Sequence, residues 1–468
     1  MEADAETVFN YLGKRYEDAF LDSPKLCQVV RRTISALEPH SRVLDVGCGT
    51  GKPVADIVAS AGHEVYGIDI SETMVNIAHS QVRGTFQKAD MRQYTPPCAM
   101  DAVFAVYSLF QISPSDTHSM VFKFAEWLRE GGLLVLGVTP STSLRSDQGT
   151  FDPVWGCIRE VIKPWMTWVT KETFLSEQGW LDLLRQAGFS IEAERLFQFL
   201  PNDAEHKTAE AHYLLVARKT TSTPLLGPYP LPQEHAVLPL LHEKTWASLQ
   251  RQLVIEGGQT PVLGHMAGAQ SLLELGCGLS SFMKASEMSF DGATQSLPAL
   301  LERLPFADGQ FNATFSTFAL DSVPNLRSAL SELARITDPS SPAASITIVQ
   351  GAPDNEVIRL LNSVCLPRST QTPQPSHQGY LLHYAKKVLS MEGFGNISLH
   401  RVRSKYVFAE HDTVNHVADL VAGSRYREDN KLEEMKKALA PHLLNLFSEH
   451  PDTLRNDLVM LIARPTPN

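Results

Sequence analysis

Residues 43–51 read VLDVGCGTG, and this stretch decides the fold of the chain. A run of apolar, strand-forming residues ends here in three glycines, Gly47, Gly49 and Gly51. Glycine permits a tight turn and lets a ligand approach the backbone without a Cβ atom in the way. The stretch therefore predicts a buried strand, a turn and a following helix. Such a turn either binds a ligand or only connects two elements, and these nine residues leave both interpretations open.

Strands and amphipathic helices alternate around this turn. Helical stripes of apolar side chains run through residues 26–37 and 120–128, and apolar runs typical of strands occupy 64–70, 101–110 and 132–138. Alternation of this kind predicts an α/β fold, in which a parallel sheet is covered by helices on both faces.

Three acidic residues follow three successive predicted strands. Asp45 ends the first strand, Asp69 ends the second, and Asp90 follows with Met91 beside it. The carboxyl edge of an open α/β sheet is where ligands bind. A carboxylate there can hold a ribose diol or accept from an exocyclic amine, while a methionine packs on a purine face. Any one of these acids alone would be explained as a helix cap or a solvated turn residue.

These motifs resemble the class I S-adenosylmethionine-dependent methyltransferases, especially their ubiquinone-biosynthesis-like small-molecule branch. VLDVGCGTG resembles motif I, GIDIS the acidic loop after the second strand, KADMRQY the adenine-binding segment and LREGGLLVLG the strand that follows. The resemblance covers roughly residues 8–219 and, more faintly, 232–464. It implies a Rossmann-like, doubly wound sheet with S-adenosyl-L-methionine as cofactor. A Rossmann dehydrogenase is the alternative, but its glycines are spaced GxGxxG, whereas this loop continues GCGTGKP.

The resemblance also implies which residues bind the cofactor. The three glycines would line its methionine moiety, and Asp69 would hold the ribose hydroxyls. Met74 and Met91 would flank the adenine, whose amino group Asp90 would contact. The full set implied in this way is Tyr16, Asp45, Gly47, Gly49, Gly51, Asp69, Ile70, Met74, Asp90, Met91 and Val106.

Acceptor contacts are expected from the N-terminal segment, from the end of the fourth strand and from a tryptophan-rich insertion at 154–170. The acceptor-binding candidates are Tyr11, Tyr107, Ser108, Gln111, Trp155, Trp165 and Trp168. In similar proteins a tyrosine of the N-terminal segment closes over the cofactor and the insertion caps the acceptor. Three tryptophans favour an aromatic or otherwise apolar acceptor. Packing of these aromatic side chains in the core is the alternative.

Methyl transfer needs alignment of a nucleophile and exclusion of water rather than a catalytic triad or a metal, and no metal site is expected. The candidate catalytic residues are Tyr107, Gln111 and His118. Gln111 stands where similar sequences often have histidine, which removes one base. His118 could instead cap a helix or be exposed, and His206 and His212 have no partner that the sequence identifies. Oxygen, nitrogen, sulfur and carbon acceptors all remain open.

The chain also contains a weak internal repeat. LDVGCGTG at 44–51 corresponds to LELGCGLS at 273–280, DAVFAVYSLF at 101–110 to NATFSTFALD at 312–321, and YLLVARK at 213–219 to VMLIARP at 459–465. The first pair is 229 positions apart and the second 211, so the second copy is 18 residues shorter between them. The shortening falls where the ribose-binding strand end should be, and Ser280 replaces the third glycine. Glu287 and Asp291 are the only candidates for the acidic residue that would hold the ribose in the second copy.

The repeat predicts two domains. A methyltransferase domain at 1–220 and a linker at 221–234 precede a degenerate copy at 235–468 with 41 additional residues near its end. Those residues include a helical stripe, which we expect to fill the uncovered place in the second sheet: Leu432, Met435, Leu439, Leu443 and Leu446. One cofactor per chain is expected, bound by the first copy.

Composition excludes several classes of function. Of 468 residues, 41 are basic and 52 acidic, so the net charge of −11 disfavours nucleic-acid binding and anionic membranes. No apolar run reaches the ~20 residues of a membrane span, and the polar N-terminus does not resemble a secretory signal. Six scattered cysteines without a CxxC pair suit the cytoplasm. The function expected is methylation of a small-molecule specialised metabolite, with a cyclisation or rearrangement on the same fold, or an assembly role, as alternatives. A homodimer is left open.

Overall fold

The computed structural model describes residues 4–145, 148–206, 208–220, 225, 242–266, 268–276, 301–320, 323, 325–370, 378–409 and 413–467. The chain divides into two compact units, residues 1–224 and 225–468. Of the predicted linker at 221–234, only Leu225 lies within the described residues. None of the described helices is both long and apolar enough to cross a membrane.

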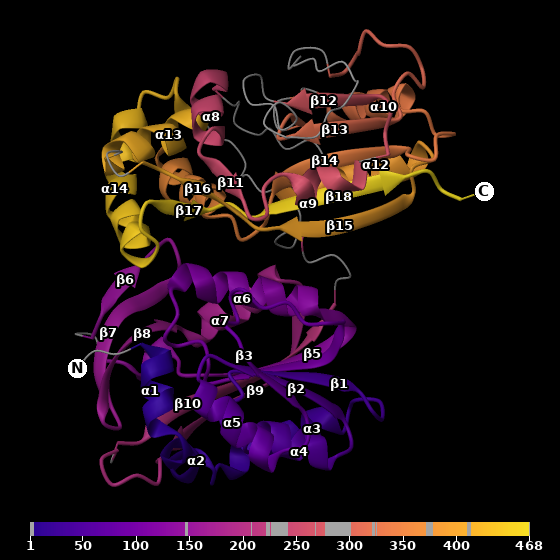
Figure 1. Cartoon of the computed structure of the whole chain (residues 1–468). Coiled ribbons are helices and arrows are strands. Elements are labelled where there is room, and N and C mark those ends of the chain that lie inside the picture. Colours follow the sequence, from indigo (N-terminus) through magenta and orange to yellow (C-terminus); the bar gives the residue numbers. More distant parts are fainter. Residues whose placement is uncertain are drawn as a thin grey trace. The chain divides into compact units, whose positions relative to one another are not determined.

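The first unit is built on a seven-stranded sheet with strand order β3-β2-β1-β4-β5-β10-β9 (Figure 1). Its strands are β1 (Arg42–Val46), β2 (Glu64–Asp69), β3 (Thr85–Lys88), β4 (Met100–Val106), β5 (Leu128–Val138), β9 (Phe189–Phe199) and β10 (Glu210–Lys219). Strands β1 to β5 are parallel, whereas β10 is antiparallel to both β5 and β9. The fold is α/β as predicted, and the parallel sheet has an antiparallel edge, β10 and β9, which the alternation of strands and helices did not specify.

Helices cover both faces of this sheet, with α3, α4 and α5 on one face and α6 and α7 on the other (Figure 1). The helices are α1 (Ala5–Leu12), α2 (Lys14–Phe20), α3 (Pro24–Ile34), α4 (Val54–Ser60), α5 (Glu72–Gln81), α6 (Pro114–Trp127) and α7 (Glu177–Gln186). Three of them begin after a serine whose hydroxyl accepts from an amide of the first turn: Ser71, Ser113 and Ser176. These caps fix where each helix leaves its strand or loop.

A small antiparallel sheet, β6-β7-β8, lies between β5 and α7 in the chain. It comprises β6 (Thr150–Asp152), β7 (Cys157–Trp165) and β8 (Trp168–Leu175). The Thr173 amide donates to the Phe110 carbonyl at 3.0 Å. The tryptophan-rich insertion is therefore a β-structured arm, and it is tied to the segment after β4.

The second unit repeats part of this plan. Its main sheet has the order β12-β13-β14-β18-β15, and a three-stranded sheet, β11-β16-β17, accompanies it. The strands are β11 (Leu253–Ile255), β12 (Leu272–Gly276), β13 (Ala313–Thr317), β14 (Ser345–Gly351), β15 (Asn396–Val402), β16 (Ser404–Val407), β17 (Thr453–Arg455) and β18 (Leu458–Arg464). The helices are α8 (Glu243–Gln250), α9 (Thr260–Leu263), α10 (Leu326–Ile336), α11 (Glu356–Leu360), η6 (Leu361–Cys365), α12 (Gln378–Met391), α13 (Val414–Tyr426) and α14 (Leu432–Glu449).

The five strands of this main sheet correspond in order and direction to β1, β4, β5, β10 and β9 of the first unit. Among the described residues, β12 pairs only with β13, so β2 and β3 have no counterpart there. The residue after β4 and the residue after β13, Tyr107 and Phe318, both have a left-handed backbone, with φ of 54° and 52°. The register of the repeat is thus kept. Residues 277–300, where the sequence predicts the loss of the ribose-side strand end, lie outside the described residues, so that prediction stays open. Ser280, Glu287 and Asp291 lie outside the described residues.

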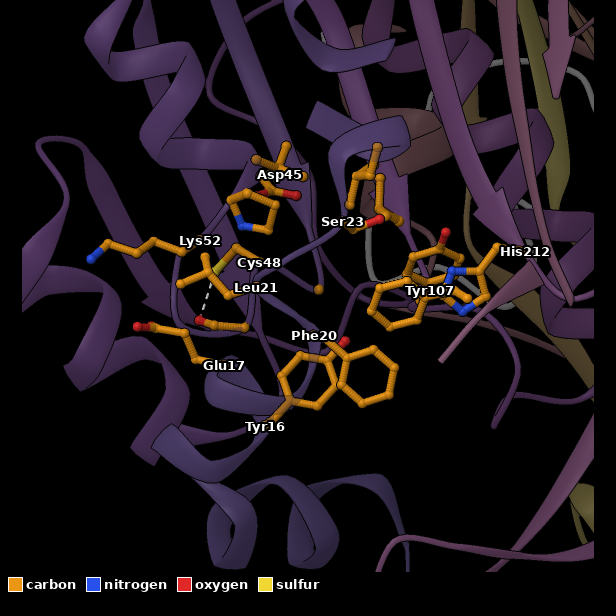
Figure 2. Close-up of a pocket in the computed structure, with 17 residues that line it drawn as sticks. Tyr16, Glu17, Phe20, Leu21, Ser23, Asp45, Cys48, Lys52, Tyr107 and His212 are labelled. Carbon is orange, nitrogen blue, oxygen red and sulfur yellow. Dashed lines mark hydrogen bonds between the residues drawn. The ribbon is translucent and has the colours of Figure 1, made fainter. Parts of the chain in front are cut away.

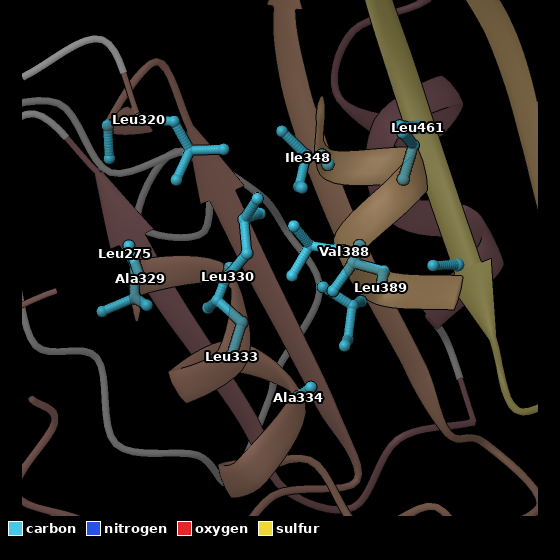
Figure 3. Close-up of a cluster of buried hydrophobic side chains, with 14 of the residues drawn as sticks. Leu275, Leu320, Ala329, Leu330, Leu333, Ala334, Ile348, Val388, Leu389 and Leu461 are labelled. Carbon is cyan, nitrogen blue, oxygen red and sulfur yellow. The ribbon is translucent and has the colours of Figure 1, made fainter. Parts of the chain in front are cut away.

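The core of the second unit forms where α10 and α12 pack on the sheet (Figure 3). Leu330 and Leu333 of α10 and Leu389 of α12 are buried against Ile348 and Leu461. Helix α14 buries its apolar stripe, as predicted, but it packs on α13, η6 and β17. The prediction that it fills the uncovered place in the second sheet is therefore wrong, because α14 packs on α13 and β17 of the additional segment and on η6 before it.

Candidate active site

The three glycines of the loop after β1 all have a left-handed backbone, with φ of 72°, 51° and 84°. A Cβ atom on Gly47 would lie 2.3 Å from the Cβ of Ser108, and one on Gly51 would lie 2.9 Å from a methyl group of Val82. A Cβ on Gly49 would meet only the Tyr16 ring, at 3.8 Å. Gly47 and Gly49 therefore keep the loop open toward β4 and α2. Gly51 instead lies against Val82 and Ala78 of α5 and its C-terminal end, and it does not line either cavity described below.

Two buried carboxyl groups lie behind this loop. Asp69, at the end of β2, accepts from the Gly49 amide at 2.9 Å and from the Ser71 amide at 2.8 Å, and its burial raises its pKa. Asp45, at the end of β1, has its pKa raised to about 7 by burial and by the negative charge of Asp69, against the opposing hydrogen bond of the Ala55 amide. Two acids in this state create a site that favours a cationic ligand.

Asp90 is held differently. Burial tends to raise its pKa, but hydrogen bonds from the Arg92 guanidinium and amide outweigh burial and lower it. Arg92 also lies 3.3 Å from Asp116, at the start of α6. Asp90 is thus an ionised carboxylate with one face already engaged by arginine.

A cavity of about 380 Å³ opens over the carboxyl ends of β1, β2 and β4. It is lined by most of the residues that the sequence singled out: Tyr16, Gly47, Gly49, Asp69, Ile70, Asp90, Met91, Val106, Tyr107, Ser108 and Gln111. A smaller cavity of about 50 Å³ lies on the other side of the glycine loop and shares Tyr16, Gly47 and Tyr107 with the first. Figure 2 shows this smaller cavity, where Asp45 lines one side and Tyr107 and His212 lie together on the other.

Several predicted residues do not line either cavity. Met74 is fully buried within the packing of α5, and Tyr11 is 66% exposed with its ring against Trp168. His118 is buried, and its Nε2 lies 3.3 Å from the Trp155 carbonyl. His118 and Trp155 contact each other, and neither of them lines the two cavities.

Trp165 has a supporting position. Its ring packs against Phe9, Tyr16 and Phe20, and its Nε1 donates to Glu210 at 3.0 Å. Trp165 therefore packs against Phe9, Tyr16 and Phe20, which line the cavities, whereas the ring contact of Trp168 is with Tyr11.

Four residues that the sequence did not assign belong to this region. Asn10 accepts from the Ser71 hydroxyl at 2.7 Å and from the Thr73 amide, and so fastens α1 to α5. Arg92 holds Asp90, while Glu210 and His212 begin β10. Because β10 runs antiparallel to β5, its first residues lie at the carboxyl edge of the sheet. Glu210 and His212 could have been assigned to this edge only if the direction of β10 had been known, and the sequence pattern does not give that direction.

Comparison with known proteins shows which families the segment around this site is similar to. Residues 43–132 match a family model described as a methyltransferase domain, and residues 275–343 match a second model with the same description. The chain is 32% identical over 158 residues to an O-methyltransferase from Penicillium expansum, across 32% of this chain and 52% of that protein. It is 26% identical over 161 residues to an O-methyltransferase from Pyrenophora dematioidea, across 33% and 55%. The chain thus spans about half the length of these curated relatives.

Among solved structures, the magnesium protoporphyrin IX methyltransferase of Synechocystis PCC 6803 aligns with 46% of this chain and 98% of its own, at 20% identity and a TM-score of 0.33. The two family-model matches, at 43–132 and 275–343, give each unit of this α/β protein a segment similar to methyltransferase domains.

Proposed function

We propose that the protein is an S-adenosyl-L-methionine-dependent methyltransferase that acts on a small-molecule acceptor in its first unit. The observation that carries this proposal is the glycine loop whose Gly47 and Gly49 line both cavities, with Asp69 in the larger cavity and Asp45 in the smaller one, within the segment that matches a methyltransferase domain. The small-molecule branch, a cytoplasmic location and a role in specialised metabolism are parts of the same proposal.

The residues at this edge fit the cofactor. The raised pKa values of Asp45 and Asp69 reflect burial without a cationic partner, and an ammonium or sulfonium group would supply one. Asp69 is already oriented by two backbone amides and would hold the ribose hydroxyls, while Met91 and Ile70 would contact the adenine. The bound cofactor supplies an activated methyl group, and the chain's own task is to align the acceptor and exclude water.

The acceptor side lies at the end of β4. The Ser108 hydroxyl, the Tyr107 hydroxyl and both polar atoms of the Gln111 amide are buried without a hydrogen-bond partner. Buried polar atoms without partners are costly, so a polar group of a ligand is the natural partner for them. Phe9 and Phe110 line the same cavity and supply apolar contacts. This combination favours an acceptor that has an apolar body and polar substituents.

In this proposal the second unit carries no cofactor. Beside the carboxyl end of β14, Arg401 Nη1 lies 2.8 Å from Asp354 and 3.0 Å from Asp457, so this part of the edge carries a buried ion-pair cluster. The strands that would correspond to β2 and β3 are absent from the described part of this sheet.

The proposal is tested by binding and by product formation. Calorimetry of the full chain with S-adenosylhomocysteine should give saturable binding, and Asp69→Asn should weaken it by about 1.5–3 kcal/mol, the value of hydrogen bonds to a charged group. Asp182→Asn, an exposed carboxylate on α7, is the matched control and should bind normally. With labelled cofactor and a panel of hydroxylated aromatic compounds, methyl label should enter an acceptor. Acceptor conversion without S-adenosylhomocysteine would instead favour cyclisation.

A further inference from the structure

The side-chain amide of Gln111 lines the larger cavity, and both of its polar atoms lack a partner. Its Oε1 and Nε2 are buried, and neither makes a hydrogen bond within the protein. A primary amide carries one acceptor atom and one donor group side by side. Leaving both unpaired is costly, so a ligand that fits this part of the cavity offers a donor and an acceptor on neighbouring atoms.

Gln111 belongs to a segment that is fixed on both sides. The carbonyl of Phe110, the residue before it, accepts from the Thr173 amide of β8 at 3.0 Å. Two residues after it, the Ser113 hydroxyl accepts from the Asp116 amide at 3.0 Å and caps α6. The backbone of Gln111 is thus held in place, and a ligand meets its amide as part of a preformed wall.

The second unit shows which groups the turn after β4 requires. The Tyr107 amide donates to the Gly137 carbonyl at 2.7 Å. The Phe318 amide donates in the same way to the Val349 carbonyl, at 3.1 Å. These two carbonyls hold equivalent places in β5 and β14. Phe318 is therefore the counterpart of Tyr107, and both have a left-handed backbone.

The next residue is Ser108 in the first unit and Ala319 in the second. Phenylalanine and alanine keep the carbon skeletons of tyrosine and serine and lack only the hydroxyl oxygen. The turn thus forms without either hydroxyl group, although the hydroxyls of Tyr107 and Ser108 are buried without partners in the first unit. Buried polar groups that the turn does not need are explained better by a ligand than by stability.

The charge of the larger cavity limits what this ligand can be. Four acidic residues line it: Asp4, Glu6, Asp69 and Asp90. Arg92 also lines it, but its guanidinium donates to Asp90 and lies 3.3 Å from Asp116. A carboxylate or a phosphate is therefore disfavoured as the group that pairs with Gln111.

Among neutral groups, a lactam complements the Gln111 amide. A hydroxyl group beside a ketone donates to its own carbonyl and does not need another partner. In a lactam the N–H and the C=O lie on the same edge of the ring and point outward, so they cannot bond to each other. The Oε1 of Gln111 can accept from such an N–H while its Nε2 donates to the carbonyl oxygen.

We propose that Gln111 determines the acceptor specificity of this site, and that the acceptor is a neutral lactam on an apolar ring, bound through its amide edge. This inference rests on the function proposed for the same cavity. Phe9 and Phe110, which line the cavity, contact the ring. Ser108 lies beside the glycine loop, since a Cβ on Gly47 would be 2.3 Å from the Cβ of Ser108. The nucleophilic atom of the acceptor therefore faces Ser108, and its lactam edge faces Gln111.

Two compounds of the same shape test the proposal. 7-Hydroxy-2-quinolone and 7-hydroxycoumarin share their hydroxyl and carbonyl groups, but the ring N–H of the quinolone is a ring oxygen in the coumarin. In the full chain saturated with S-adenosylhomocysteine, calorimetry should give a Kd for the quinolone about 10-fold or more below that for the coumarin. The reason is that the coumarin leaves Oε1 of Gln111 unpaired. Equal affinities, a preference for the coumarin, or no binding of the quinolone would overturn the inference.

Substitutions separate the two ends of the acceptor. Gln111→Met keeps the size of the side chain but removes both polar groups, and it should bring the two Kd values within about twofold of each other by weakening the quinolone. Gln111→Leu is a second variant with the same expected result. Ser108→Ala, which introduces the residue of the second unit, should weaken both compounds alike, because both carry the hydroxyl group. Gln178→Leu, at an exposed glutamine of α7, is the matched control and should keep the full preference.

The Kd for S-adenosylhomocysteine, measured in each variant, distinguishes the role of Gln111 from a loss of folding and should stay within about twofold. A preference for the quinolone that persists in Gln111→Met, or that disappears in Ser108→Ala, would overturn the inference. The preference is a binding measurement and needs no methyl transfer, so its failure leaves the proposed function standing. Absence of S-adenosylhomocysteine binding by the unaltered protein would instead overturn the proposed function itself.

Discussion

Asp45 and Asp69 place two carboxyl groups beside the glycine loop, where both are largely buried. Asp69 is balanced by two backbone amides, whereas burial and the charge of Asp69 leave Asp45 with a pKa of about 7. At the scale of single residues, ionisation of these two buried carboxyl groups lowers the stability of the free protein. A cationic ligand would offset that loss by pairing with the ionised carboxylates.

The first prediction concerns pH. Because the folded-state pKa of Asp45 lies above its ordinary value of 3.8, the free protein should lose stability as the pH rises from about 4 through 7. A cationic ligand binds the ionised form, so the affinity for S-adenosylmethionine should increase over the same interval. Thermal melts and calorimetry at pH 5.5 and 8.5 measure both effects. Asp45→Asn should remove both pH dependences, and equal affinities of the unaltered protein at the two pH values would contradict this assignment.

A second prediction separates packing from backbone strain in the glycine loop. Gly51 and Gly62 have nearly the same φ, 84° and 85°, but only at Gly51 would a Cβ meet a neighbour. Gly62→Ala should cost about 1–2 kcal/mol of left-handed strain alone. Gly51→Ala should cost more, because Val82 must shift as well. Urea unfolding compares the two, and an equal loss would show that the contact with α5 is unimportant.

At the scale of elements, α14 owes its place to four buried side chains on one face. Leu443 is fully buried, whereas its neighbour Leu444 is 58% exposed. Leu443→Ala should destabilise the second unit by about 2–5 kcal/mol, the cost of a cavity in a packed core. Leu444→Ala, the same change one position along, should stay within about 0.5 kcal/mol. Denaturant unfolding measures the pair, and similar losses would mean that the helix is packed on a different face.

Elements were predictable where a local pattern determines them. The strands at β1, β2 and β4 follow from apolar runs, and the residues that close them, including Asp45, Asp69 and Tyr107, come together as the carboxyl edge of a parallel sheet requires. The direction of β10 and the partners of α14 depend on contacts between distant segments, which no local pattern contains. For that reason the sequence did not assign Glu210 and His212 to the site. The contact between Trp155 and His118 likewise joins distant segments, so the sequence could not show it.

At the scale of the whole chain, the two units share five strands in the same order and direction but differ at the carboxyl edge of the sheet. Both units have a residue with a left-handed backbone after the corresponding strand, Tyr107 after β4 and Phe318 after β13. Both also have an antiparallel strand beside the last parallel one, β10 beside β5 and β18 beside β14. The first unit has unpartnered buried polar atoms at its carboxyl edge, whereas the second unit has the ion pairs of Arg401 beside the carboxyl end of β14. We therefore propose that the ligand binds to the first unit.

The most direct test of this central claim is the stoichiometry of cofactor binding. Titration calorimetry of the full chain with S-adenosylhomocysteine should give one site per chain, and combining Asp45→Asn with Asp69→Asn should remove that site while the protein remains folded by circular dichroism. Two sites per chain, or a site that persists in the doubly substituted protein, would contradict the account.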